Sequence, residues 1–180
     1  MKCLLTNLVL AAGLLLTLSQ GDATAAEVAL LYRADMPQVE FAAAEIVAAL
    51  QARGDTVVKG RVGDGGNVPQ SLRIILVSAG DDAGRWATDL GVAPLTSTSS
   101  QSYALRRKAE GKRTTCVVLG ADAVGAMYGG LDVAEAIRLG TLADLKDAGH
   151  QPYVARRGNK FNIPLDARTP GYSDAGDAAQ

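Results

Sequence analysis

The stretch that most restricts the fold is residues 101–139, where two apolar segments precede a glycine-rich loop and an amphipathic helix. Residues 101–106 alternate between apolar and polar, which predicts a half-exposed strand, and residues 114–119 are almost continuously apolar, which predicts a buried one. The short connection between them contains Gly111 and polar residues, as a hairpin turn of this length requires. We therefore expect two paired, antiparallel strands.

A helix is predicted directly after this hairpin. Asp122 is placed to cap its first turn. Its apolar residues recur at steps of three and four, at Val124, Met127, Tyr128, Leu131, Ala134 and Ile137. Gly125 and Gly129 lie on one face of this helix, and each costs about 1 kcal/mol relative to alanine. The cost is offset if the helix approaches the sheet closely at these positions.

The glycine loop before the helix does not have the sequence of a nucleotide-binding loop. Gly120 and Gly125 have the spacing of a P-loop, but Ala126 and Met127 stand where lysine and a hydroxyl residue are needed. The dinucleotide-binding fingerprint fails as well, because its glycine spacing is absent and the preceding strand is the second arm of a hairpin. We expect no phosphate binding at this loop and no cofactor.

Residues 1–25 have the features of a secretory signal peptide. Lys2 precedes an apolar run at residues 8–18, and Ala23 and Ala25 form a small-residue cleavage site. We expect residues 1–25 to be removed and the mature protein to be periplasmic or extracellular. Cys3 would leave with the signal, and Cys116, on an apolar strand, is expected to be a small buried hydrophobe.

The remaining chain has the length of one domain, which we place at residues 26–155. Its elements before the hairpin are predicted at residues 27–32 (strand), 35–54 (helix), 55–59 (strand) and 72–78 (strand), followed by a helical turn around Trp86 and Leu90. The strand at 72–78 is the most hydrophobic and should be central. Because helices interrupt the strands only twice, we predict an α+β fold, a mixed and largely antiparallel sheet with two helices packed on one face.

Few residues offer catalytic or metal chemistry. His150 is the single histidine, and the Cys-x-x-Cys and Gly-x-Ser-x-Gly motifs are absent, so we expect no metal site and no catalytic residues. Asp132 and Glu135 are expected on the wet face of the second helix, and His150 in an ordinary surface loop. The net charge of −1 gives no reason to propose nucleic acid or an anionic membrane as a partner.

The aromatic residues divide between the predicted core and the surface. Those on predicted core faces are Tyr32, Tyr103 and Tyr128. Those left as surfaces on which a sugar could stack are Trp86, Tyr153 and Tyr172.

The segments at residues 101–105, 116–120 and 123–137, together with Gly111, resemble the small non-catalytic domain that precedes the barrel in α-glucuronidases and β-N-acetylhexosaminidases. The resemblance covers about residues 27–153. It implies a mixed sheet with two helices on one side and a role in support of a catalytic barrel.

Residues 156–168 are similar to the sequence that leads into the first barrel strand of such hydrolases, with matching positions at Arg157, Gly158, Leu165, Asp166 and Arg168. The resemblance implies that Asp166 and Arg168 contact the sugar substrate. We expect residues 156–180 to be a linker and the flexible start of a truncated barrel.

Together these observations predict an exported, non-catalytic accessory domain of a glycoside-hydrolase-type protein, and the chain as given should not be an enzyme. Its partners would be a carbohydrate or a catalytic barrel, with no membrane contact after signal cleavage. Two alternatives remain open. The chain could be a fragment of a complete secreted glycoside hydrolase, of the α-glucuronidase or hexosaminidase kind, or it could be a stand-alone carbohydrate-binding module.

Overall fold

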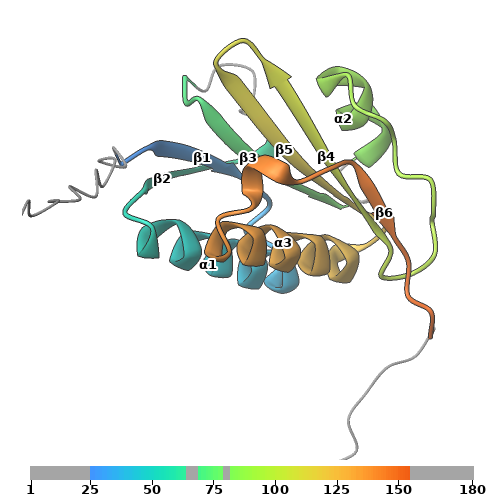
Figure 1. Cartoon of the computed structure of the whole chain (residues 1–180). Helices are drawn as coiled ribbons and strands as arrows, with labels where there is room; N and C mark the ends of the chain where they lie inside the picture. Colours follow the sequence, from blue (N-terminus) through green and yellow to red (C-terminus); the bar gives the residue numbers. More distant parts are fainter. Residues whose placement is uncertain (1–24, 64–68, 79–81, 155–180) are drawn as a thin grey trace, which may run out of the picture.

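The structure, a computed structural model, describes residues 25–63, 69–78 and 82–154. Within them, six strands form one sheet in the order β2-β1-β3-β5-β4-β6 (Figure 1). The strands are β1 (Glu27–Leu31), β2 (Thr56–Gly60), β3 (Leu72–Ser78), β4 (Tyr103–Glu110), β5 (Arg113–Gly120) and β6 (Ala148–His150). The helices are α1 (Pro37–Ala52), α2 (Ala83–Leu90), α3 (Ala123–Arg138) and the 3-10 helix η3 (Leu142–Asp144). The predicted signal peptide, apart from Ala25, and the barrel-like segment at 156–180 lie outside the described residues.

The sheet is mixed, as predicted, but parallel pairs are more numerous than expected. Strands β2, β1, β3 and β5 run parallel, whereas β4 is antiparallel to both β5 and β6. The α+β class is confirmed, and the expectation of a largely antiparallel sheet is wrong. Strands β2 and β3 lie on either side of β1, and the sequence between them carries no helical pattern that would have indicated a parallel crossover.

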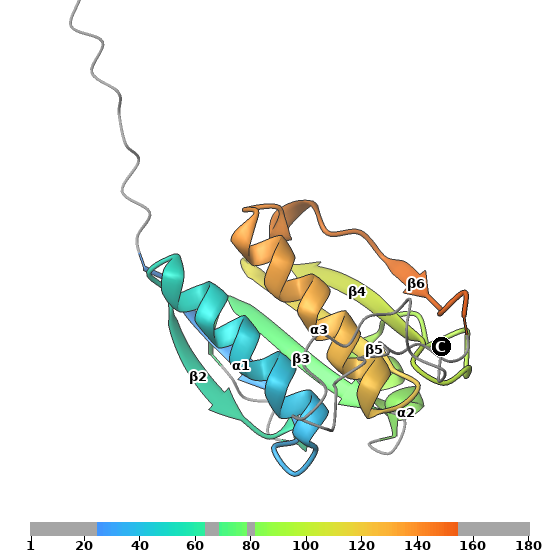
Figure 2. The same cartoon turned by 90° about the horizontal axis from the view of Figure 1, so that it is seen from below.

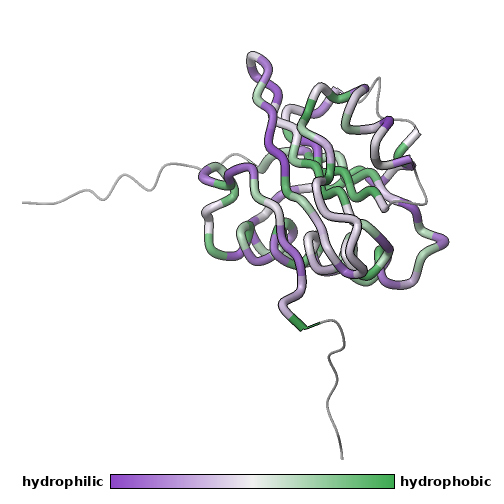
Figure 3. Tube along the Cα trace, turned by 90° about the vertical axis from the view of Figure 1, so that its right-hand side faces the viewer, coloured by the Kyte–Doolittle hydropathy of each residue, from purple (hydrophilic) through white to green (hydrophobic). Residues whose placement is uncertain are grey.

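Helices α1 and α3 lie side by side on one face of the sheet, as predicted (Figure 2). The main core between them and the strands includes Val28, Leu30, Ala42, Ile46, Leu50, Ile74, Leu76, Val118, Val133 and Ile137. Strand β3 is central, also as predicted, and its side chains from Arg73 to Ser78 are buried. In Figure 3 the strands at the centre of the molecule are the most hydrophobic part of the trace.

Helix α2 lies on the opposite face of the sheet (Figure 1). It covers a smaller core made of Leu31, Val62, Ile75, Val77, Ala87, Ala104, Val117 and Leu119. None of the helices in the described part of the chain has the length and apolar character of a membrane span.

The close approach of α3 to the sheet is confirmed. A Cβ atom at Gly129 would lie 2.5 Å from Cγ1 of Val118, and one at Gly125 would lie 2.2 Å from the carbonyl oxygen of Ser102. The predicted cap is present too, because Oδ1 of Asp122 accepts a hydrogen bond of 2.7 Å from the Gly125 amide. The glycines and the cap together fix where α3 begins and how near it lies to β4 and β5.

The hairpin of β4 and β5 has the predicted turn, with Gly111 at a φ of +59° between the paired residues Glu110 and Arg113. Strand β6, which was not predicted, pairs with the outer edge of β4. The buried guanidinium of Arg106 helps to hold it there by donating to the carbonyl oxygen of Ala148 at 2.8 Å.

Candidate functional site

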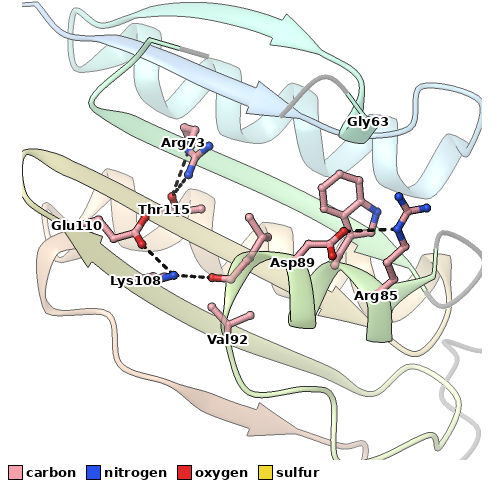
Figure 4. A pocket seen from close by; sticks show the side chains of 10 residues that line it. Gly63, Arg73, Arg85, Asp89, Val92, Lys108, Glu110 and Thr115 are labelled. Carbon is pink, nitrogen blue, oxygen red and sulfur yellow. Dashed lines mark hydrogen bonds and ion pairs between the residues drawn. The ribbon is translucent and has the colours of Figure 1, made fainter. Parts of the chain in front are cut away.

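A groove runs between α2 and the sheet (Figure 4). We call it the α2 groove; its volume is about 420 Å³. Its floor is formed by Arg73, Lys108, Glu110 and Thr115, and its wall by Gly63, Arg85, Trp86, Asp89, Leu90 and Val92.

The polar floor follows from strand alternation. On β3, Arg73 shares a face with Ile75 and Val77, and on β5, Thr115 shares that face with Val117 and Leu119. Helix α2 covers the apolar members of these rows. The polar residues Arg73 and Thr115 lie on the same face of the sheet but beyond the part that α2 covers. The groove therefore has a polar floor beside an apolar core.

Helix α2 carries the aromatic residue of the groove. Ala87 is 1 % exposed and anchors the helix on the sheet, and Trp86 is half-buried next to it at the rim. The helix ends at Gly91, whose φ of +62° lets the Val92 amide donate back to the carbonyl of Ala87 at 2.9 Å. This turn brings Val92 down to the wall of the groove.

The charged groups of the floor are held by hydrogen bonds. Arg73 is buried, and its Nε and Nη2 donate to the hydroxyl of Thr115 at 3.2 and 2.9 Å. Burial, and then the like charge of Arg113, lowers the pKa of Arg73, although a guanidinium stays protonated at neutral pH. Lys108 donates at 2.9 Å both to Glu110 and to the carbonyl of Leu90.

The carboxylates of the groove are both paired. The hydrogen bond from Lys108 holds the pKa of Glu110 below its ordinary value, so Glu110 is ionised and is not a proton donor at neutral pH. Asp89 forms an ion pair with Arg85, one turn earlier on α2, at 3.4 Å. Both carboxylates therefore have a cationic partner on the protein, although these pairs are largely open to solvent.

A second hollow of about 730 Å³ adjoins the α2 groove at Gly63 and Trp86. Its other lining residues are Tyr32, Arg33, Ala34, Asp35, Arg61, Val62 and Asp82. It lies at the carboxyl ends of β1 and β3, from which the chain leaves to α1 on one face and to α2 on the other. Open sheets with parallel strands bind ligands at such a switch point.

Arg33 and Asp35 form an ion pair at the second hollow, with 2.8 Å between Nε and Oδ1. The hydrogen bond from Arg33 keeps the pKa of the Asp35 carboxyl below its ordinary value. The half-buried ring of Trp86 is therefore flanked by fixed charges on two sides. This arrangement suits a polar ligand that also has an apolar face. In the described ranges, no three or more His, Cys, Asp or Glu side chains are grouped so that they could hold a metal ion.

The structure describes some of the candidate site residues that the sequence analysis named, and others lie outside the described ranges. Trp86 lies at the groove, whereas Tyr153 is fully exposed beyond β6 and is not part of it. Asp166, Arg168 and Tyr172 lie outside the described residues. The floor residues were missed, although counting back by twos from Val77 through Ile75 to Arg73 would have placed a charge on the sheet face.

Three expectations about polar and aromatic side chains are corrected. His150 is not in an ordinary loop but on β6, where its ring stacks on Tyr103 with 4.7 Å between the centroids. Asp132 accepts a hydrogen bond from the Tyr103 hydroxyl instead of facing only water, while Glu135 is exposed as expected. Tyr128, expected in the core, is only half-buried and lines a small pocket with these residues. A three-residue strand leaves too little sequence pattern to reveal this cluster.

Two other sequence expectations concern single groups. Cys116 is buried, as predicted, and burial raises the pKa of its thiol to about 12. The carboxylate of Asp122 occupies the amino end of α3, where it also accepts from the amide of Gln101 at 2.9 Å. A fixed negative charge at this position disfavours phosphate there.

Comparisons with known proteins identify no family. No family model matches the chain, and no curated protein matches it. Among solved structures, the fold is similar to part of a GH138 enzyme targeting pectin rhamnogalacturonan II, with 19% sequence identity and a TM-score of 0.46. The match covers 70% of this chain and 15% of that chain. The function of this chain is therefore inferred from its own residues.

Proposed function

We propose that this chain is a non-catalytic accessory domain of an exported carbohydrate-active protein and that it binds carbohydrate in the α2 groove. The observation that carries the proposal is the ring of Trp86, set between two hollows lined by charged side chains. The sequence resemblance to the domains that precede hydrolase barrels supports the accessory role.

The chemistry of the groove matches that of a sugar. A sugar ring has an apolar C–H face, which an aromatic ring can cover, and a rim of hydroxyl groups that donate and accept hydrogen bonds. Lys108 and Glu110 offer a donor and an acceptor on the floor of the groove that Trp86 also lines, and Arg73 adds a guanidinium. Because Arg73 is buried and already held by hydrogen bonds to Thr115, ordering this side chain on binding costs little.

The same contacts support a non-catalytic role. Most glycoside hydrolases use a pair of carboxyl groups, one of which has a raised pKa and donates a proton. The carboxylates that line the described part of the groove, Asp89 and Glu110, are each paired with a cation, and the pKa of Glu110 is lowered. We expect the purified chain not to hydrolyse aryl glucuronides or aryl N-acetylhexosaminides; turnover that a substitution in this chain abolishes would contradict the non-catalytic part of the proposal.

Glycan binding is tested by screening the chain against a glycan array and then measuring affinity for the strongest glycan. Trp86→Ala and Trp86→Leu should each weaken binding about tenfold or more, equivalent to about 1.4 kcal/mol, because neither offers a ring face. Trp86→Leu retains apolar packing on the core and so separates lost stacking from lost folding.

The matched control for this experiment is Phe41→Ala, which removes an aromatic ring that is 53 % exposed on α1, on the other face of the sheet. It should bind as the unsubstituted chain does. Failure of the chain to bind any glycan, or equal binding by the Trp86 variants, would exclude the groove as a carbohydrate site.

Export is part of the proposal and has its own test. If residues 1–25 are a signal peptide, the mature chain begins near Ala26. Intact-mass measurement of the protein recovered from the periplasm or the medium should show this amino terminus. Secreted protein that still carries Met1 would show that the segment is not cleaved.

A further inference from the structure

A separate cavity of about 310 Å³ lies near the carboxyl ends of α1 and α3, at the opposite ends of the strands from the second hollow. Its polar lining consists of Arg53, Ser71, Arg107, Lys112 and Thr114, and we call it the basic cavity. The described lining residues include three cationic side chains and no carboxylate.

The cations of the basic cavity are incompletely balanced. Arg53 is paired with Asp55, at 2.6 Å between Nε and Oδ2. In the part of the chain that the structure describes, neither Arg107 nor Lys112 forms an ion pair. The nearby carboxylate of Asp147 accepts a hydrogen bond of 2.9 Å from the backbone amide of Arg107, not from its guanidinium.

Arg107 also has an unused donor. Its Nε is buried, and no acceptor among the described residues reaches it. Leaving a buried donor of a charged group unsatisfied is unfavourable, so an acceptor that approached this guanidinium from the cavity would be stabilising. An oxyanion suits this position, because a guanidinium can hold two of its oxygens at once.

The carboxyl-terminal ends of α1 and α3, which lie near the cavity, repel an anion only weakly. Each carboxyl end carries roughly half a negative charge, about one charge in all, against the two unpaired cations. Several of the final carbonyls are also satisfied, as in the bonds from Gly54 to Gln51 at 2.9 Å and from Gly140 to Ile137 at 3.1 Å. The lining of the cavity itself is positive, although the nearby carboxylate of Asp147 and the helix ends reduce the net charge around it.

We propose that the basic cavity binds a tetrahedral oxyanion, sulfate or phosphate. Arg107 and Lys112 would supply the charge, and the hydroxyls of Ser71 and Thr114 would donate hydrogen bonds. The site is distinct from the glycine loop at the amino end of α3 and from the α2 groove, so it does not depend on carbohydrate binding there.

The test is calorimetric titration of the purified chain with sodium sulfate and, separately, with sodium phosphate, at constant ionic strength. We expect saturable binding of one ion per chain for at least one of the two, and the comparison shows which is preferred. Arg107→Gln should weaken the affinity about tenfold or more, because it removes a charge-assisted bidentate contact. Lys112→Gln, at the exposed hairpin turn, should also weaken it and provides a second test should Arg107→Gln fold poorly.

The matched control is Lys59→Gln, which makes the same change of charge at an exposed position on β2, away from the cavity. Its affinity should equal that of the unsubstituted chain. Lack of saturable binding by millimolar sulfate and phosphate would overturn the proposal. So would an equal loss in Lys59→Gln, since that result would indicate attraction by net charge alone.

Discussion

At the scale of single residues, the missing side chain of Gly129 determines how closely α3 lies on the sheet. A Cβ atom there would meet Val118 at 2.5 Å and Tyr103 at 2.8 Å. We expect Gly129→Val to lower the free energy of unfolding by about 1–3 kcal/mol, because it overpacks this contact. Chemical denaturation measures the change.

The control for this substitution is another helical glycine. A Cβ atom at Gly84, on α2, would meet nothing within 4 Å. Gly84→Ala should therefore leave stability unchanged or raise it by up to about 1 kcal/mol through helix propensity. Equal stability of Gly129→Val and the unsubstituted chain would mean that this face of α3 does not touch the sheet.

Asp122 links stability to pH. Partial burial opposes its ionisation, but hydrogen bonds from Gly125, Gln101 and Ser100 outweigh burial, so its pKa in the folded protein lies below the ordinary value. A lowered folded-state pKa contributes stability above the unfolded-state pKa, near 3.9, and this contribution is lost as the pH falls through the folded-state value.

We therefore expect Asp122→Ala to lower the free energy of unfolding by about 1 kcal/mol at neutral pH, as the loss of a helix cap does. The difference from the unsubstituted chain should shrink as the pH is lowered below about 4. Denaturant titrations at several pH values test this. A difference that stays constant down to the acid transition would show that the ionised carboxylate is not what stabilises the helix.

At the scale of elements, the sequence correctly predicted the helices and strands whose own residue pattern shows which of their side chains are buried. The strand at Leu72–Ser78 and the buried stripe of α1 could be read from periodicity, and the cap at Asp122 from local chemistry. The direction of the strands could not be predicted in this way. An apolar run indicates that a strand is buried, but it does not show which strand lies beside it or in which direction that neighbour runs.

The candidate site was even less predictable than the strand directions. Trp86 was singled out because it is an aromatic residue outside the predicted core. Arg73, Lys108 and Thr115 come from three different strands, and only the order of those strands brings them to one floor. Asp166 and Arg168, suggested by resemblance, stay predictions because they lie outside the described residues.

Strand β6 is short but is held by several contacts. The guanidinium of Arg106 donates to Ala148, the carboxylate of Asp147 accepts from Arg107, and His150 stacks on Tyr103. A chain that ends at Lys146 should have a lower melting temperature than the full chain, because Arg106 loses an acceptor while its charge stays buried. An unchanged melting temperature would show that β6 adds nothing to stability.

At the scale of the whole molecule, both hydrophobic clusters, as far as the structure describes the chain, are built from residues between Val28 and Leu145. Deletion of residues 158–180 should therefore leave the melting temperature nearly unchanged, since stability follows the apolar surface that a segment buries. Calorimetry of the two chains makes the comparison. Loss of cooperative unfolding after this deletion would place the domain boundary, predicted at residue 155, in the wrong position.

The backbone contact between α3 and the sheet also bears on how this domain can evolve. Gly125 contacts the backbone carbonyl of Ser102, not a side chain. A substitution of Gly125 therefore cannot be compensated by a second substitution at the residue that it contacts. The contact of α2 with the sheet consists of side chains, which can vary in pairs. Mutational drift should therefore concentrate on the α2 face, where ligand preference can diversify while the helical layer on the other face keeps the fold intact.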